Sequence, residues 1–557
     1  MDIAAPRLTI EDPENNDKLP LKLLLKDYSA MSEKAVVKYE ISLEWKGHRI
    51  DGRYDITVQP AATQPEDVLL YTSELAFEEP IQHDLLVQQG FDIPKALVER
   101  MILPERDGFL RSYPLKAFGS GAGRFELGKK AATGAPCSEL GIPVIGLALA
   151  DRADRAKNLQ FSVCMDPYCG GRIDASYGTV TVSTTYMGSA VPLVAEKRTI
   201  AMAIHSQDAD QMLTSFYHTV PHIRPGAAWI HDVHLLYYDY LSDDGQGWYK
   251  GLEYLADRIN LKHRGRVAVC LHGWYDYFQQ YAYDHEKGKL IDEWTAFPGT
   301  RKIPMSIKSM HDRLQFARKL GFRVLLYFSD GTNSDTGAPG FRPDFVLKDS
   351  SGKTSKGWKG PDSLGDAVKM DPSVPGLRDW YRGYLRALLD EYARDIDGLV
   401  WDETFYIRSG TVSYTGKTPT YADRAMMSLV SELTQIVQEY HRVNDQLVFL
   451  VSDGSQTSYA LVAHGTWQDT ACDPQDWGPG MFRNYRNCLW SCLWYPISKA
   501  DRNRIAAEQY GLPQCLSNGW EDDQGPHEMP AEILEDVLRR FTRNVEAKRH
   551  RMKYLSP

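Results

Sequence analysis

The chain has 557 residues, of which 43% are hydrophobic and 25% are charged, and its formal net charge is −10. These values are typical of a globular protein with more than one domain. The negative charge, with no run of Lys or Arg, argues against nucleic acid as a partner. No window approaches about 18 uninterrupted apolar residues, which argues against a membrane span.

The N-terminal segment and the cysteines bear on cofactors and location. The sequence MDIAAPRLTIEDPENND has neither the basic region nor the apolar core of a signal peptide. The eight cysteines are scattered, with no CxxC pair and no nearby His cluster. We therefore expect no metal site, no cofactor and mostly reduced thiols. A cytoplasmic location follows, or secretion with a leader absent from this sequence.

The first part of the chain has the pattern of antiparallel strands. Alternating or continuous apolar residues, many of them β-branched or aromatic, lie between Gly, Asp and Pro. The predicted strands include Ala35–Trp45, Tyr54–Val58, Leu159–Met165 and Gly178–Thr185. One segment, Asp92–Met101, also fits a helix. An antiparallel β-sandwich over residues 1–225 is the predicted fold, with a boundary near His222–Gly226.

After this boundary, apolar strands alternate with amphipathic helices about eight times over roughly 330 residues. The predicted helices are Tyr249–Ile259, Ser306–Leu320, Pro375–Tyr392, Tyr421–Tyr440 and Glu532–Arg549. The predicted strands are Arg266–Leu271, Phe322–Phe328, Ala367–Met370, Ile396–Trp401, Leu447–Val451, Tyr459–Ala463, Cys488–Tyr495 and Pro513–Leu516. This order predicts a (β/α)8 TIM barrel over residues 226–557. A doubly wound sheet is less favoured because no GxGxxG follows a strand.

Carboxylates and tryptophans gather at the ends of the predicted barrel strands, where such barrels carry their chemical groups. The strand Ile396–Trp401 is followed by Asp402 and Glu403, and a buried carboxylate costs several kcal/mol unless it has a partner or a function. The other candidates after strands are Trp274, Asp276, Asp330, Asp453, Trp467, Asp469, Asp473, Trp520 and Asp522.

This residue set suits glycoside chemistry, which uses paired carboxylates and aromatic faces. Asp330 and Asp453 each lie in an SDG segment and could instead hold a turn. Trp274, Trp401 and Trp467 could instead pack the barrel. HxH and HExxH spacings are absent, and no strand end offers a Schiff-base Lys.

Four segments resemble the retaining α-glycosidases of the α-galactosidase clan. Lys319–Gly331 (KLGFRVLLYFSDG) is similar to that clan's second strand, and Asp395–Phe405 (DIDGLVWDETF) is similar to its fourth. Gly465–Trp477 (GTWQDTACDPQDW) resembles the region of the sixth strand, and Ser517–Asp523 (SNGWEDD) resembles a later strand end. The resemblance implies a β-supersandwich followed by a (β/α)8 barrel, and a retaining glycosidase.

The resemblance also implies roles for particular residues. Asp402 takes the position of the clan's nucleophile, and Asp469 is the favoured acid/base, with Asp473 and Asp453 in reserve. Substrate contacts are expected from Trp274, Asp276, Asp330, Trp401, Glu403, Trp467, Trp520 and Asp522. The expected partner is a carbohydrate substrate that resembles an α-galactoside, and homo-oligomerisation stays open.

Two other functions stay open at this point. The spacing of acids after Trp467 departs from the clan's pattern, which would suit a barrel that binds sugars without cleaving them. A metal-dependent lyase or isomerase would use His272, Asp276, Asp330 and Asp371.

Overall fold

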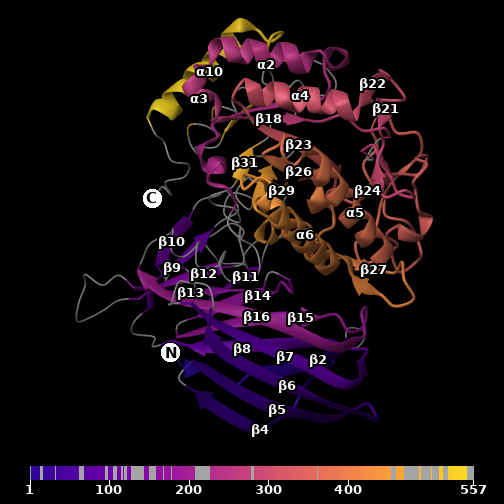
Figure 1. Cartoon of the computed structure of the whole chain (residues 1–557). Coiled ribbons are helices and arrows are strands. Elements are labelled where there is room, and N and C mark those ends of the chain that lie inside the picture. Colours follow the sequence, from indigo (N-terminus) through magenta and orange to yellow (C-terminus); the bar gives the residue numbers. More distant parts are fainter. Residues whose placement is uncertain are drawn as a thin grey trace. The chain divides into compact units, whose positions relative to one another are not determined.

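A computed structural model describes most of the chain, which forms two compact units (Figure 1). Unit 1 comprises Met1–Pro221, Thr418–Arg424 and Tyr554–Pro557, and unit 2 comprises His222–Lys417 and Ala425–Lys553. The described residues are 2–12, 17–31, 33–61, 68–93, 98–104, 110–114, 117, 122–126, 144–149, 159–166, 168–176, 178–206, 226–277, 281–360, 362–452, 459–468, 488–490, 504, 508, 513–517 and 525–547.

Unit 1 is built from two antiparallel sheets. The larger sheet has the order β10-β9-β12-β13-β16-β7-β6-β5-β4, and the smaller has the order β11-β14-β15-β8-β2-β3, with β1 also paired to β8. Their strands are β1 Asp2–Ile3, β2 Arg7–Asp12, β3 Asp17–Pro20, β4 Leu23–Met31, β5 Lys34–Trp45, β6 His48–Pro60, β7 Val68–Ile81, β8 Asp84–Asp92, β9 Val98–Pro104, β10 Leu110–Pro114, β11 Ala122–Glu126, β12 Val144–Leu149, β13 Leu159–Cys164, β14 Arg172–Ser176, β15 Thr179–Tyr186 and β16 Leu193–Ser206.

The core of unit 1 joins apolar residues from both sheets. Leu8 and Val87 come from the smaller sheet, whereas Ile41 and Tyr71 come from the larger one, and all four belong to one buried cluster. Alternate residues of each strand face this core, as in a β-sandwich. The helix considered for Asp92–Met101 is wrong, because β8 ends at Asp92 and β9 begins at Val98.

Unit 2 contains a sheet of eight parallel strands with the order β31-β30-β29-β26-β23-β18-β17-β32. Most are fully buried along their length, as parallel strands covered on both faces require. Their bounds are β17 Leu235–Asp239, β18 Val267–Leu271, β23 Arg323–Asp330, β26 Gly398–Asp402, β29 Val448–Val451, β30 Gly465–Gln468, β31 Cys488–Trp490 and β32 Gln514–Ser517.

Helices lie around this sheet in Figure 1, where α2, α4, α5 and α6 surround the labelled strands. The helices are α2 Gly247–Arg258, α3 Leu261–Arg264, α4 Ile307–Lys319, α5 Pro375–Tyr392, α6 Ala422–Glu439 and α10 Ala531–Glu546. Sequence signals fix several of their ends. Ser306 caps α4 in a capping box with Ser309, and Gly321 follows it with φ +92°, a conformation that favours glycine.

Short elements connect the main ones. The short strands are β19 Tyr283–Asp284, β20 Lys289–Leu290, β21 Glu293–Ala296, β22 Ile303–Ser306, β24 Asn333–Asp335, β25 Ala367–Lys369, β27 Val412–Ser413 and β28 Thr420–Tyr421. The 3₁₀ helices are η3 Ala228–Asp232, η4 Asp243–Gly245, η5 Pro343–Phe345, η6 Thr404–Tyr406, η7 Tyr440–Arg442 and η8 Tyr459–Val462.

The structure corrects two of the predicted barrel strands and adds one that was not predicted. A parallel strand not predicted from the sequence, β17, precedes β18 in the sheet. The predicted strand Ala367–Met370 is instead β25, which pairs antiparallel with β24 outside the main sheet. The predicted strand Tyr459–Ala463 is the 3₁₀ helix η8. In chain order β23 is therefore the third strand of the sheet rather than the second, while β26 is still the fourth.

Candidate active site

A register shift in β23 turns two polar side chains toward the same face of the sheet. Tyr327 pairs with Val400 of β26, and Ser329 pairs with Trp401, so the pairing shifts by one residue between them. In an unshifted strand, residues three apart point to opposite faces. Here the Tyr327 hydroxyl donates to Asp330 Oδ1 at 2.6 Å.

Asp330 lies beside Asp402, its direct partner in the register of β23 and β26. Both side chains are buried, Asp330 with 5% and Asp402 with 1% of its surface exposed. Asp402 accepts a hydrogen bond from its neighbour's backbone, Glu403 N, at 2.7 Å. It also accepts one from the hydroxyl of Ser452, the residue after β29. Three adjacent strand ends thus place two carboxylates and a hydroxyl in one row.

Burial and mutual repulsion shift the proton affinity of the two carboxyls. Burial raises the pKa of Asp402, while the hydrogen bonds from Ser452, Glu403 N and Tyr327 oppose that rise. Burial, aided by the charge of Asp402, raises the pKa of Asp330 to about 7, against the hydrogen bonds from Tyr327 and Tyr281. Two carboxylates that share a site do not ionise together readily. Each carboxyl of the pair is therefore harder to ionise than an exposed one.

A buried network of aromatic residues supports the pair. Tyr281 donates to Asp330 Oδ2 at 3.3 Å and lies 2.9 Å from His272 Nε2. The other ring nitrogen of His272, Nδ1, forms a hydrogen bond with the hydroxyl of Tyr238 on β17. The His272 ring also stacks on Tyr327, with ring centroids 3.5 Å apart. Burial lowers the pKa of His272 well below its usual value, so the ring is neutral.

Trp467 lies close to this network and shows that the sheet is strongly curved. Its ring centroid is 6.0 Å from that of Tyr238, although four strands separate β30 from β17 in the sheet order. In a flat sheet such strands would be about 24 Å apart, at the usual spacing of roughly 4.8 Å. The Trp467 side chain is fully buried, and its indole nitrogen has no hydrogen-bond partner among the described residues.

The two other central tryptophans have packing contacts. Trp401 alternates with Asp402 and faces the helix side of β26, where its ring lies 5.1 Å from Tyr381 of α5. Its indole N–H donates to Gly331 O. Trp274 is fully buried, and its indole N–H donates to Tyr327 O at 3.1 Å. Both tryptophans therefore make the packing contacts that were considered for them as the alternative to a substrate contact.

Two further predicted residues lie in the loops near the pair. Glu403 has a left-handed backbone, with φ +55°, and its side chain accepts a hydrogen bond from Asn333 at 2.9 Å. The Glu403 side chain is therefore held by β24, of which Asn333 is the first residue. Asp276 is buried after β18, accepts from Ala282 N at 2.8 Å, and has its pKa raised by burial to about 6.

The remaining predicted site residues lie outside the described part of the chain. They are Asp453, Asp469, Asp473, Trp520 and Asp522. Asp469 directly follows Gln468, the last residue of β30.

Sequence reasoning missed Tyr327, Tyr281 and Ser452 as members of the site. Tyr327 stands within the predicted apolar run and reads as core. Ser452 gave a usable signal, because it is a polar residue directly after the predicted strand Leu447–Val451.

Within the described ranges, no group of three or more His, Cys, Asp or Glu is placed to hold a metal ion. No described helix is long and apolar enough to cross a membrane.

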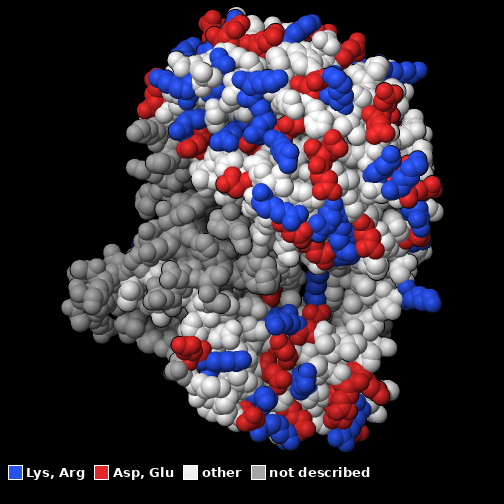
Figure 2. Space-filling view, viewed as in Figure 1, with Lys and Arg blue, Asp and Glu red and all other residues white. Residues whose placement is uncertain are grey.

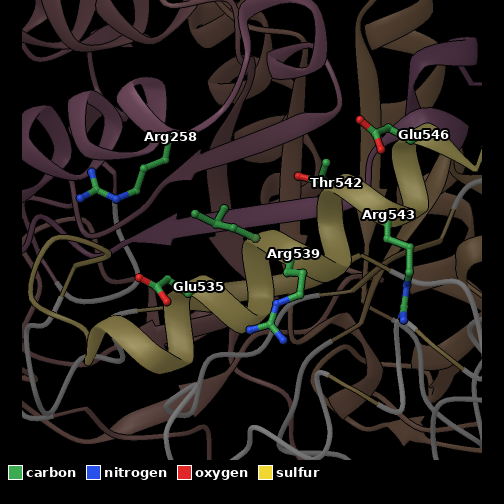
Figure 3. Close-up of a pocket in the computed structure, with 7 residues that line it drawn as sticks. Arg258, Glu535, Arg539, Thr542, Arg543 and Glu546 are labelled. Carbon is green, nitrogen blue, oxygen red and sulfur yellow. The ribbon is translucent and has the colours of Figure 1, made fainter.

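A hollow of about 710 Å³ lies between α2 and α10, lined by charged side chains that include Arg258, Glu535 and Arg543 (Figure 3). None of the predicted site residues lines it.

The two-unit fold with its curved parallel sheet is found in known α-glycosidases. Among solved structures, a GH36 α-galactosidase AgaA variant from Geobacillus stearothermophilus, crystallised with 1-deoxygalactonojirimycin, matches with a TM-score of 0.55 and 14% identity. The match covers 98% of this chain and 76% of that one. The resemblance to the α-galactosidase clan is thus confirmed at the level of the fold.

Two further structures share the fold. The GH36 α-galactosidase AgaB from the same organism has a TM-score of 0.51 at 12% identity, covering 98% of this chain and 75% of that one. A GH31 sulfoquinovosidase from E. rectale, in complex with an aza-sugar inhibitor, also has a TM-score of 0.51, at 10% identity, covering 98% and 78%. No protein-family model matches the sequence, and no curated protein matches it.

Proposed function

We propose that this protein is a retaining α-glycosidase that acts on an α-galactoside-like substrate, with Asp402 as its nucleophile. The observation that carries the proposal is the buried pair of carboxylates, Asp402 and Asp330, at the ends of adjacent parallel strands. The fold shared with α-glycosidases supports the reaction class. The proposal includes closure of the eight strands into a (β/α)8 barrel, which the short distance between Tyr238 and Trp467 supports.

The environment of Asp402 suits an attacking carboxylate. A nucleophile must be ionised, and three hydrogen-bond donors favour the ionised form of Asp402 against the effect of burial. Asp330 has the higher affinity for the shared proton in this scheme. When protonated, it can donate a hydrogen bond to a sugar hydroxyl, which is the role of a substrate contact.

The proposed reaction has two displacements. An oxygen of Asp402 bonds to the anomeric carbon while the glycosidic C–O bond breaks, and Asp469 gives its proton to the leaving oxygen. Asp469 then takes a proton from water, which attacks the anomeric carbon and releases Asp402. Both displacements invert the anomeric carbon, so its configuration is retained overall. The position of Asp469 directly after β30 supports its role as the acid/base.

The test is hydrolysis of p-nitrophenyl α-D-galactopyranoside by the full chain and by D402N. We expect D402N to lose roughly three orders of magnitude or more of kcat, because an amide cannot attack. The matched control is D312N, which makes the same change at an exposed position of α4 that pairs with Lys308. D312N should keep full activity, and circular dichroism should show that both variants are folded.

Three results would count against the proposal. Substantial turnover by D402N would remove Asp402 from the role of nucleophile. A product of inverted configuration, followed by NMR, would exclude a retaining mechanism. Sugar binding by calorimetry, with no hydrolysis of any aryl α-glycoside, would favour a barrel that binds sugars without cleaving them.

A further inference from the structure

The edge strand β4 of unit 1 carries an unusual amount of exposed apolar surface. β4 lies at the end of the larger sheet, and no strand in the described part of the chain pairs with its outer edge. Leu25, Tyr28 and Met31 have 61%, 62% and 70% of their surface exposed. A long, apolar edge strand offers unpaired backbone groups to another strand, and soluble proteins usually protect such edges.

A shift in the pairing with β5 places Leu25 and Tyr28 on one face of β4, while Leu24, Asp27 and Met31 lie on the other. Leu25 pairs with Tyr39, whereas Tyr28 pairs with Val37, because Lys26 is an extra residue in the ladder. Leu25 and Tyr28 therefore share one face with Tyr39 and Val37, which are partly buried against the sandwich core. The core-facing side of the sheet thus continues, uncovered by other described residues, to its edge.

The opposite face of β4 carries charges of both signs. Lys26 lies 2.5 Å from Glu40, and Asp27 lies 3.6 Å from Lys38, both on β5. All four side chains are largely exposed. Exposed ion pairs of this kind contribute little on their own, so they leave these charges able to interact with a partner as well.

The order of residues in β4 is complementary to itself when the strand is reversed. If two copies run antiparallel about the step between Lys26 and Asp27, then Lys26 of each copy lies opposite Asp27 of the other. Leu25 of each copy then lies opposite Tyr28 of the other. Opposite charges and apolar pairs directly across an antiparallel ladder are the stabilising combinations. Four charges then follow one another across the two paired strands: Lys38 and Asp27 of one copy, then Lys26 and Glu40 of the second copy. Their signs alternate along this row.

We propose that β4 is a homodimer interface, at which a second copy of this chain adds its own β4 to the edge of the larger sheet. The contact is isologous, because the same strand serves both partners. The occupant is a second copy rather than an unrelated strand because the charge and apolar patterns both match under one reversal. In Figure 1, β4 is the outermost indigo strand, with β5 and β6 beside it.

The test measures the mass of the full chain by sedimentation between about 1 and 100 µM. The native chain should dimerise. K26D and D27K should each weaken the dimer about tenfold or more, because each places like charges opposite each other twice. An equimolar mixture of K26D and D27K should restore dimers, since opposite charges then face each other again. Y28K should weaken the dimer as well.

The matched control is K197D, which makes the same change on β16, inside the same sheet, where Lys197 pairs with Glu74. K197D should dimerise like the native chain, and thermal melts should show that every variant is folded. A native chain that stays monomeric up to about 100 µM would overturn the proposal. A dimer that survives K26D, D27K and Y28K would overturn it too, because the contact would then lie elsewhere.

Discussion

The two units bury charged side chains in different places along their strands. In unit 1, Arg198 lies in the middle of β16 and is 1% exposed. One guanidinium nitrogen donates to Val87 O and Thr184, and the other two have no partner among the described residues. In unit 2, Asp330 and Asp402 are each the last residue of a strand. A charge in mid-strand is enclosed by its own sheet, whereas a charge at a strand end faces the loops through which a ligand enters.

Charge itself is distributed evenly over the surface that Figure 2 shows. Acidic and basic residues are interspersed there, and the described residues of that face form no broad basic region. Surface charge on this face therefore says little about function. The two units differ instead in where along their strands the buried charges lie. Three predictions test that contrast, and a fourth concerns a helix cap that involves no charge.

The largest of these effects is expected for Y327F. This change removes a donor to Asp330 that also lowers the pKa of Asp402. We expect kcat/KM to fall roughly 10- to 100-fold, as for a lost hydrogen bond to a charged group. The pKa of both carboxyls should rise, so the acid limb of the pH profile should move to higher pH. Y384F is the control, because its hydroxyl donates to Phe328 O on the helix side of the same strand, and its profile should not move.

D330N should change how stability depends on pH. Burial raises the pKa of Asp330 to about 7 in the folded state, against about 3.9 in an unfolded chain. The bound proton therefore stabilises the native protein below about pH 4, and this contribution is lost as the pH rises to about 7. D330N lacks this titration, so it should gain stability relative to the native chain over that range. Thermal melts across the range would measure the difference, and parallel curves would contradict the prediction.

R198M should affect neither activity nor folding strongly. Burial of the Arg198 guanidinium costs free energy of desolvation, and no carboxylate among the described residues forms an ion pair with it. Met has a similar length and carries no charge, so it avoids that cost. We expect unchanged kcat/KM and a melting temperature equal to or above that of the native chain. A loss of activity comparable to that of Y327F would show that the mid-strand charge is not merely structural.

A small loss of stability is expected for S306A. Ser306 accepts from Ser309 N at 3.1 Å, and its backbone N–H donates to the Ser309 hydroxyl at 2.9 Å. Losing the cap side chain should cost about 1 kcal/mol of stability, visible as a lower urea midpoint with kcat/KM unchanged. K308A, on the exposed surface of the same helix, should leave the midpoint nearly in place.

Elements with clear boundary signals could be predicted from the sequence. The helix predicted at Pro375–Tyr392 has those bounds in the structure, because Pro suits a first turn and the apolar period continues to Tyr392. Short apolar runs were ambiguous. The run at Tyr459–Ala463 has the composition of a buried strand but forms a 3₁₀ helix, and periodicity cannot separate the two over so few residues.

The candidate site was predictable in part. Asp402 and Asp330 were identified as residues that follow or end strands, which depends on local pattern alone. Their pairing depends on the relative register of β23 and β26, and the roles of Tyr327 and Tyr281 depend on contacts between segments far apart in sequence. Such contacts are set by tertiary packing, which one sequence does not display.

The register shift in β23 has a consequence for comparing this chain with its structural relatives. Past the shift, each residue occupies the place that its neighbour would hold in an unshifted strand. A gap-free alignment of β23 with an unshifted strand would therefore match Asp330 to a helix-facing position. Deleting Phe328 should remove the extra residue, so that Ser329 and Asp330 keep their partners on β26 and the carboxylate stays beside Asp402. One inserted residue thus decides whether a sequence comparison assigns Asp330 to the side of Asp402 or to the helix-facing side of this strand.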